Sequence, residues 1–130
     1  MTKEEILNME PGLELDRLVA EWVMGWKEEH IEDDRWHINA NFWCRGNEIG
    51  PQVQKWSPST DIAAAWEVVE KLASQGIMVV IESQGPLNNI YKVLFYRWGT
   101  NTIVGMAEGN ICEAICRAAL LAVQSGEEKG

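Results

Sequence analysis

Residues 56–66 read Trp-Ser-Pro-Ser-Thr-Asp-Ile-Ala-Ala-Ala-Trp, and this stretch decides how the elements on either side of it are arranged. Pro58 favours an extended conformation for the residue before it. Ser59 or Thr60 can then cap a helix, and Asp61 places a negative charge in the first turn, where the helix dipole favours it. The stretch therefore predicts a strand before the proline and a helix that begins near Thr60.

The helix that follows is predicted over residues 60–74, because Gly76 is a natural stop and apolar residues recur at helical spacing. This apolar stripe consists of Ile62, Ala65, Trp66, Val69, Leu72 and Ala73. We expect the stripe, Trp66 included, to face the core. Trp56 precedes the turn and lies off the stripe.

The same signals of spacing and turn chemistry predict the other elements. Helices are predicted over residues 2–9, 11–25 and 110–126, and strands over residues 36–44, 51–56, 77–81, 90–98 and 102–107. Residues 27–35 are predicted to be a polar, acidic loop. The apolar run 77–81 is typical of a strand that is covered on both faces.

Two helix starts carry capping-box pairs, in which a side chain three residues on bonds back to the cap. The pairs are Thr2 with Glu5 and Asn110 with Glu113. The last helix also contains four alanines that allow close approach to a sheet or to a partner helix. These are Ala114, Ala118, Ala119 and Ala122.

The element order is α-β-β-α-β-β-(β)-α, with strands joined mainly as hairpins, so the predicted class is α+β. We expect a three-layer α/β/α sandwich: a mostly antiparallel sheet of four to five strands with helices on both faces. The 130 residues fit a single domain, 1–130, with residues 1–2 and 126–130 frayed.

Composition narrows the function classes. The chain carries 11 basic and 20 acidic residues, a net charge of −9, which weighs against binding to duplex nucleic acid. No apolar run approaches the roughly 20 residues of a membrane span, and the acidic N-terminus does not read as a signal peptide. The three cysteines lack a disulfide or zinc spacing, so we expect reduced thiols in the cytoplasm.

Catalytic and metal-binding patterns are weak. His30, Asp33, Asp34 and His37 are possible metal ligands, but nothing places them on one face and no calcium-loop glycine pattern accompanies them. We expect a solvated segment there, with no metal and no cofactor. No Ser/His/Asp order, phosphate-binding loop or carboxylate pair stands out, so the chain is not expected to be an enzyme.

A ligand site is predicted from the unusual number of tryptophans, seven in all. The corner offers an aromatic ring, three hydroxyls and a helix N-terminus, which suits an anion. The candidate ligand-binding residues are Trp43, Arg45, Lys55, Trp56, Ser57, Ser59 and Thr60, with Arg97 and Trp98 as a second cluster. The polar face of the strand over residues 36–44, with His37, Asn39, Asn41 and Trp43, faces either solvent or ligand. The alternative is that the hydroxyls only cap the helix and Trp56 only packs on it.

Two motifs carry a family resemblance. They are residues 56–72, which continue the opening stretch with Glu-Val-Val-Glu-Lys-Leu, and residues 113–120, Glu-Ala-Ile-Cys-Arg-Ala-Ala-Leu. Together with residues 4–7 and 13–21 they resemble the phage ABA sandwich domain family, over about residues 2–124. The resemblance implies a layered α/β/α fold in a phage or prophage protein and brings no catalytic residues with it. Residues 108–112 depart from the family pattern by lacking a proline.

From the resemblance and the candidate residues we expect a non-catalytic accessory protein in the cytoplasm of the infected or lysogenic host cell. It would bind and sequester a small anionic host molecule, such as a nucleotide immune signal, as an anti-defence sponge. The alternative is a protein–protein interaction module that inhibits or adapts a host protein, where the net charge of −9 would steer a basic partner. Self-association is a further expectation, and contact with a membrane is not expected.

Overall fold

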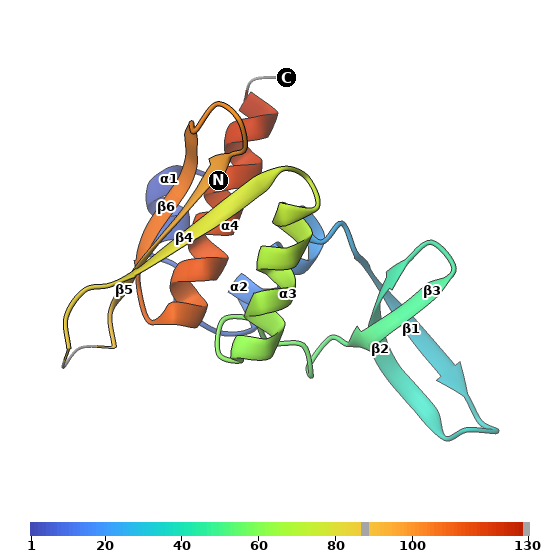
Figure 1. Cartoon of the computed structure of the whole chain (residues 1–130). Helices are drawn as coiled ribbons and strands as arrows, with labels where there is room; N and C mark the ends of the chain where they lie inside the picture. The colour runs from blue at the N-terminus through green and yellow to red at the C-terminus, as the bar shows by residue number, and fades with distance from the viewer. Residues whose placement is uncertain (87–88, 129–130) are drawn as a thin grey trace.

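The computed structural model describes residues 1–86 and 89–128, which form two three-stranded antiparallel sheets and several helices (Figure 1). In chain order the elements are α1 (Lys3–Leu7), α2 (Leu13–Leu18), the π-helix η1 (Val19–Val23), β1 (Lys27–Asp33), β2 (Ile38–Arg45), β3 (Glu48–Gln52), α3 (Ile62–Ala73), β4 (Ile77–Ser83), β5 (Tyr91–Arg97), β6 (Ile103–Gly109) and α4 (Ile111–Glu128). The strand orders are β1-β2-β3 and β4-β5-β6.

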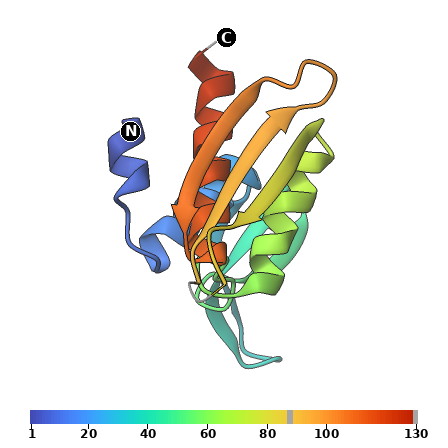
Figure 2. The same cartoon turned by 60° about the vertical axis from the view of Figure 1, so that its left-hand side comes forward.

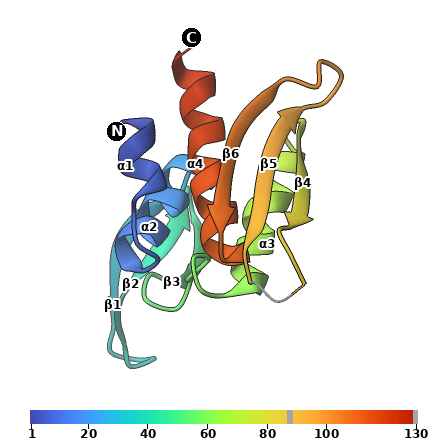
Figure 3. The same ribbon diagram turned by 90° about the vertical axis from the view of Figure 1, so that its left-hand side faces the viewer.

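Helix α4 is the centre of the main body. It packs against β5 and β6 on one side and contacts α1, α2, η1 and α3 on the others, so that α1 lies across α4 from the sheet (Figures 2 and 3). All four alanines predicted to allow close approach are buried, as are Cys112, Ile115, Cys116 and Leu120. The helix is therefore surrounded by the fold along most of its length.

Both predicted capping-box pairs are confirmed. The Glu5 N–H donates to Thr2 Oγ1 at 3.1 Å at the start of α1. At the start of α4, the Asn110 N–H donates to Glu113 Oε1 at 2.9 Å, and Asn110 Oδ1 in turn accepts from the Cys112 N–H at 3.1 Å. The first turns of these helices are thus satisfied locally, by side chains close in sequence.

The β4-β5-β6 sheet carries α3 and α4 on one face, through inward residues such as Val93 and Phe95. Its opposite face bears two apolar cross-strand rows, and among the described residues no helix packs on it. The rows are Met78–Tyr96–Ile103 and Val80–Leu94–Met106. The prediction that residues 77–81 are covered on both faces is therefore wrong: β4 is an edge strand, and Val80 is 36% exposed.

The β1-β2-β3 sheet projects from the body as an arm (Figure 1). Residues 27–35 were predicted to be a loop, but Lys27–Asp33 pair with β2 in unbroken register from Lys27–Cys44 to Asp33–Ile38. The many acidic side chains of this segment hid the alternation typical of a strand. Polar side chains on one face of β1 form hydrogen bonds to side chains of β2. The predicted alternation of residues 36–44 is confirmed from Ile38 to Phe42. It fails at Trp43, which was predicted on the polar face but is buried beside Cys44 where the β2–β3 register shifts, and Trp36 and His37 lie in the turn before β2, with Trp36 73% exposed.

Helix α3 differs from its prediction in its start and in its buried face. Asp61, not Ser59 or Thr60, is the N-cap, and its carboxylate accepts from the Ala63 N–H at 3.2 Å. The buried residues are Ala64, Ala65, Val68, Val69 and Leu72. Ile62 and Trp66 face outward instead, because α3 packs against α4 and β4 through its small residues.

The helical hydrogen-bonding pattern changes within residues 13–23. After α2 the chain widens into η1, in which the Met24 N–H bonds to the Val19 carbonyl at 3.1 Å. The wider turn buries Val19, Ala20 and Val23 together and leaves Trp22 37% exposed.

The α+β class and the antiparallel pairing are confirmed, and the layered family description remains consistent with this body. The single sheet of four to five strands is wrong, because the six strands divide into two separate sheets. Helices on both faces of one sheet are not found in residues 1–86 and 89–128. Within the same ranges, no helix has the length and apolarity required to cross a membrane.

Candidate functional site

The corner around Trp56 is a packed junction. Trp56 is 5% exposed, its ring meets Trp26 edge-on with centroids 4.7 Å apart, and its Nε1–H donates to Glu67 Oε2 at 2.8 Å. The indole is thus buried, and its N–H is bonded within the protein. The ring is not open for a base to stack on it.

Ser59 joins this corner to the start of α2. It is 2% exposed, its N–H donates to Asp16 Oδ1 at 2.8 Å, and its Oγ accepts from the Gly12 N–H at 2.9 Å. Burial raises the pKa of the Asp16 carboxyl, and the hydrogen bonds from Ser59 act in the opposite direction by favouring the charged form. The serine hydroxyl therefore joins two segments that lie 47 residues apart in the sequence.

The start of α3 is poorly suited to an anion. The carboxylate of Asp61 already caps it, and within the described residues no basic side chain pairs with that carboxylate, so a second negative charge beside it would be repelled. Thr60 is exposed, and its hydroxyl donates to the Ser57 carbonyl at 3.5 Å. The alternative, in which the polar groups cap the helix and Trp56 packs in the core, describes this corner better than a ligand site does.

Ser59→Ala is expected to lower the free energy of unfolding by about 1–2 kcal/mol, because the Gly12 N–H loses its partner in a part-buried setting. Ser57→Ala is the matched control. Ser57 is half-buried and its hydroxyl has no hydrogen bond within the described residues, so a change within about 0.5 kcal/mol is expected. Urea denaturation of both variants measures the difference, and equal losses would contradict this role of Ser59.

The remaining predicted residues are not brought together. Trp43 is 1% exposed at the base of the arm, whereas Arg45 and Lys55 are exposed beyond it. Arg97 and Trp98 lie at the β5–β6 hairpin of the main body, and Trp98 is 73% exposed there.

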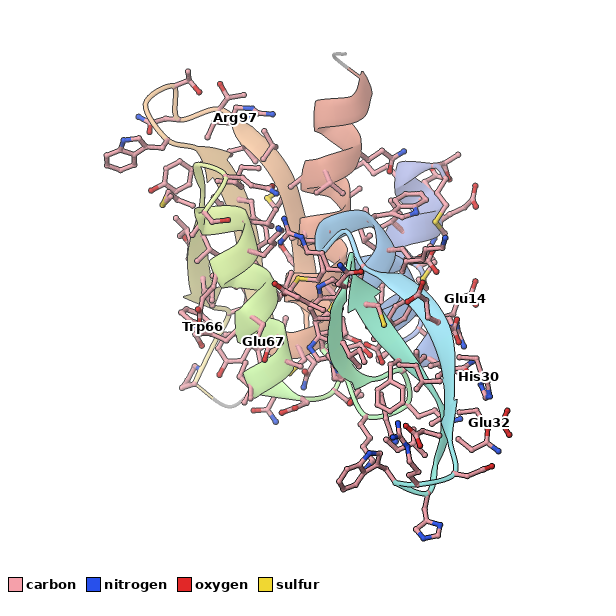
Figure 4. The ribbon with its side chains drawn as sticks, turned by 90° about the vertical axis from the view of Figure 1, so that its right-hand side faces the viewer. Glu14, His30, Glu32, Trp66, Glu67 and Arg97 are labelled. Atoms are coloured by element: carbon pink, nitrogen blue, oxygen red, sulfur yellow. The ribbon has the colours of Figure 1, made fainter. Side chains whose placement is uncertain are left out.

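A polar cleft of about 320 Å³ lies where the arm meets α2. Its lining comes from α2, from all three arm strands and from the residues after β3. The lining residues are Arg17, Glu28, His30, Asn39, Ala40, Asn41, Gln52, Val53 and Gln54. Figure 4 shows His30 and Glu32 along β1 on this side of the molecule.

Four of these side chains form one hydrogen-bonded chain. The Glu28 carboxylate accepts from Arg17 Nη1 on one oxygen and from Asn41 Nδ2, at 2.6 Å, on the other. Asn41 Oδ1 lies 2.6 Å from His30 Nδ1. The hydrogen bonds from Arg17 and then Asn41 lower the pKa of Glu28, so the carboxylate is held ionised.

The chain also sets the state of the histidine. Because the Asn41 amide nitrogen donates to Glu28, its oxygen faces His30, and Nδ1 must carry the hydrogen of that bond. Nε2 of His30 is left as the outward nitrogen: an acceptor in the neutral ring and a donor in the protonated one. The guanidinium of Arg17 likewise keeps N–H groups beyond the one that bonds Glu28.

Part of this cleft was visible in the sequence. Asn39 and Asn41 belong to the predicted polar face of β2, but His30 was assigned to a loop, and Arg17, within the predicted helix 11–25, was not singled out. Arg17 and Glu28 are 11 residues apart, as are His30 and Asn41. Recognising residues 27–33 as a strand opposite residues 38–44 would have paired Glu28, His30 and Asn41.

Other reactive groups lie away from the cleft or are inert. Cys44, Cys112 and Cys116 are buried free thiols, and burial raises the pKa of each. Among the described residues, no group of three or more His, Cys, Asp or Glu side chains is placed to hold a metal ion.

The chain belongs to the phage ABA sandwich domain family, whose sequence model matches residues 17–120. The family assignment made from the two motifs is thereby confirmed, and the chain is a phage protein. The matched span contains all the residues that line the cleft. Neither the curated proteins nor the solved structures include a match to this chain.

Proposed function

We propose that this phage protein binds a small anionic host molecule, such as a nucleotide immune signal, in the polar cleft and sequesters it without chemical change. The observation that carries the proposal is the hydrogen-bonded chain Arg17–Glu28–Asn41–His30. It holds a cation and an imidazole in fixed positions before any ligand arrives. Such preorganisation lowers the entropy cost of binding.

The chemistry of the lining suits a phosphorylated ligand with a polar base or sugar. The free N–H groups of Arg17 and Nε2 of His30 are suited to phosphate oxygens. The amides of Asn39, Gln52 and Gln54 each offer a donor and an acceptor, as recognition of a base edge requires. No aromatic side chain lines the cleft within the described residues, so recognition here rests on hydrogen bonds and charge.

Sequestration is favoured over catalysis by what surrounds His30. Within the described part of the chain, no serine, threonine, cysteine or lysine lines the cleft to act as a nucleophile. We therefore expect a bound ligand to be recovered intact. An altered ligand would favour an enzyme instead.

The experiment is calorimetric titration with a panel of cyclic dinucleotides and ADP-ribose-type nucleotides, followed by denaturation and mass analysis of the released ligand. Arg17→Met and Asn41→Leu should each weaken binding about 10- to 100-fold, because a charge-assisted bond contributes about 1.5–3 kcal/mol. Arg45→Met is the control, since Arg45 is exposed outside the cleft and its loss should leave affinity unchanged. Absence of binding across the panel, or equal effects of all three variants, would overturn the proposal.

A second candidate function, a module that inhibits or adapts a host protein, is favoured by the uncovered face of the β4-β5-β6 sheet. Two apolar rows on one exposed face form a patch of the kind that proteins use for association. A host protein that binds in the presence of saturating nucleotide, and is lost in Leu94→Lys, would favour this function over sequestration.

A further inference from the structure

A second cavity, of about 430 Å³, lies between the N-terminal segment, α4 and β6. It is lined by Met1, Thr2, Lys3, Ile103, Val104, Gly105, Met106, Leu121 and Gln124. Four of these are consecutive residues of β6. The register shift between β5 and β6 leaves Val104 buried and Gly105 against α4, whereas Ile103 and Met106 are exposed on the other face. A cavity touched by all four residues must therefore run along the strand's backbone edge.

That edge of β6 is unpaired within residues 1–86 and 89–128, since β6 ends the order β4-β5-β6. The Arg97 N–H donates to the Thr102 carbonyl at 2.9 Å and the Arg97 carbonyl accepts from the Asn101 N–H at 3.0 Å, so Arg97 is hydrogen-bonded across the turn. The next pair, Tyr96–Ile103, must then be a non-hydrogen-bonded one. The N–H and C=O of Ile103 consequently point away from β5 and toward the cavity.

Gln124 gives an independent sign of a missing partner. Its Nε2 donates to the Met1 carbonyl, but its Oε1 is buried with no hydrogen-bond partner among the described residues. A buried acceptor without a donor is costly, and native structures contain few of them. The oxygen is closed to solvent in this side-chain conformation, so a ligand N–H would relieve that cost once the Gln124 amide turns toward the cavity.

We propose that the groove between α1 and β6 binds an extended segment of a partner polypeptide, which adds as a fourth strand to the β4-β5-β6 sheet. The segment's backbone pairs with Ile103, a backbone or side-chain N–H reaches Gln124 Oε1, and apolar side chains contact Val104 and Leu121. Lys3 favours a carboxylate on the segment. This site is separate from the polar cleft, and the inference goes beyond the proposed function without depending on it.

The test uses the full chain and heptapeptides selected from a random displayed library, then synthesised with both ends blocked. Added strands pair through alternate N–H groups only. Methylating the peptide nitrogens that face β6 should therefore weaken binding at least tenfold, and methylating the other alternate set should not. In the same complex, amide hydrogen exchange at Ile103 should slow at least tenfold, whereas exchange at the already paired Val93 should not change.

Four results would overturn the proposal. The first is a library that yields no peptide with Kd below about 1 mM, and the second is an equal loss of affinity from the two sets of methylated nitrogens. The third is slowed amide exchange along β4 instead of β6. The fourth is slow amide exchange at Ile103 in the free protein, together with sedimentation as a dimer. The last result would mean that a second copy of the chain covers this edge.

Discussion

Trp43→Ala is expected to lower the free energy of unfolding by about 3–5 kcal/mol, the cost of deleting a fully buried tryptophan side chain. Trp43 is 1% exposed and lies on β2 where the arm meets the body. It belongs to the same cluster of buried side chains as Val53, Trp56 and Met24, so its loss opens a cavity at the joint between the two sheets. Because a domain has only about 5–15 kcal/mol of stability, the variant should be close to unfolding at 37 °C.

Trp36→Ala is the matched control for this prediction. The same side chain is deleted, but Trp36 lies in the β1–β2 turn and is 73% exposed, so a change within about 0.5 kcal/mol is expected. Urea denaturation followed by circular dichroism compares the two. A loss of less than about 1 kcal/mol in Trp43→Ala would contradict the packing of the arm on the body.

Gly105→Ala is expected to destabilise the protein by about 3 kcal/mol, at the upper end of the range for overpacked sites, and Gly105→Val to prevent folding. A Cβ at this position would overlap the Ala118 carbonyl oxygen and lie 2.8 Å from the Ala122 backbone nitrogen. Both atoms belong to the backbone of α4 and cannot rotate away. In an open strand the same change would stabilise by about 0.5–1 kcal/mol, so here packing reverses the sign.

Met106→Val tests whether the loss is specific to the glycine. Met106 is the next residue of β6, but it points to the other face of the sheet and is 42% exposed. A β-branched replacement suits a strand, so stability should change by less than about 0.5 kcal/mol. Thermal unfolding of both variants measures the difference. A Gly105→Ala variant with the melting temperature of the wild type would contradict the close contact between β6 and α4.

Local sequence patterns predicted most of the helices and strands, because helix caps and strand alternation depend on residues only a few positions apart. The capping pairs Thr2–Glu5 and Asn110–Glu113 form as expected, and the alternation is present from Ile38 to Phe42 of β2. The small residues of α4 also indicated close packing. The structure adds the reason, which is that Ala118 and Ala122 lie against Gly105 of β6.

The polar cleft was predicted only in part. Asn39 and Asn41 stood out as a polar strand face, but the nine candidate ligand residues came from turn chemistry and tryptophan content. Those signals identify side chains that are able to bind and do not show which are exposed. Glu28, His30 and Asn41 meet because β1 pairs with β2, and the acidic composition of β1 had indicated a loop.

By itself, the sequence determined the α+β class, the family, the helix caps and the place of the strand-to-helix corner at residues 56–66. Only the tertiary structure decided what each side chain of that corner does. Trp56, expected to be available to a ligand, is buried against Trp26, and Trp66, expected in the core, is 47% exposed. Helical spacing sets which residues share a face. Which face of α3 is buried depends on the elements that pack against it, here α4 and β4. The sequence pattern of α3 alone does not show how these elements are placed around it.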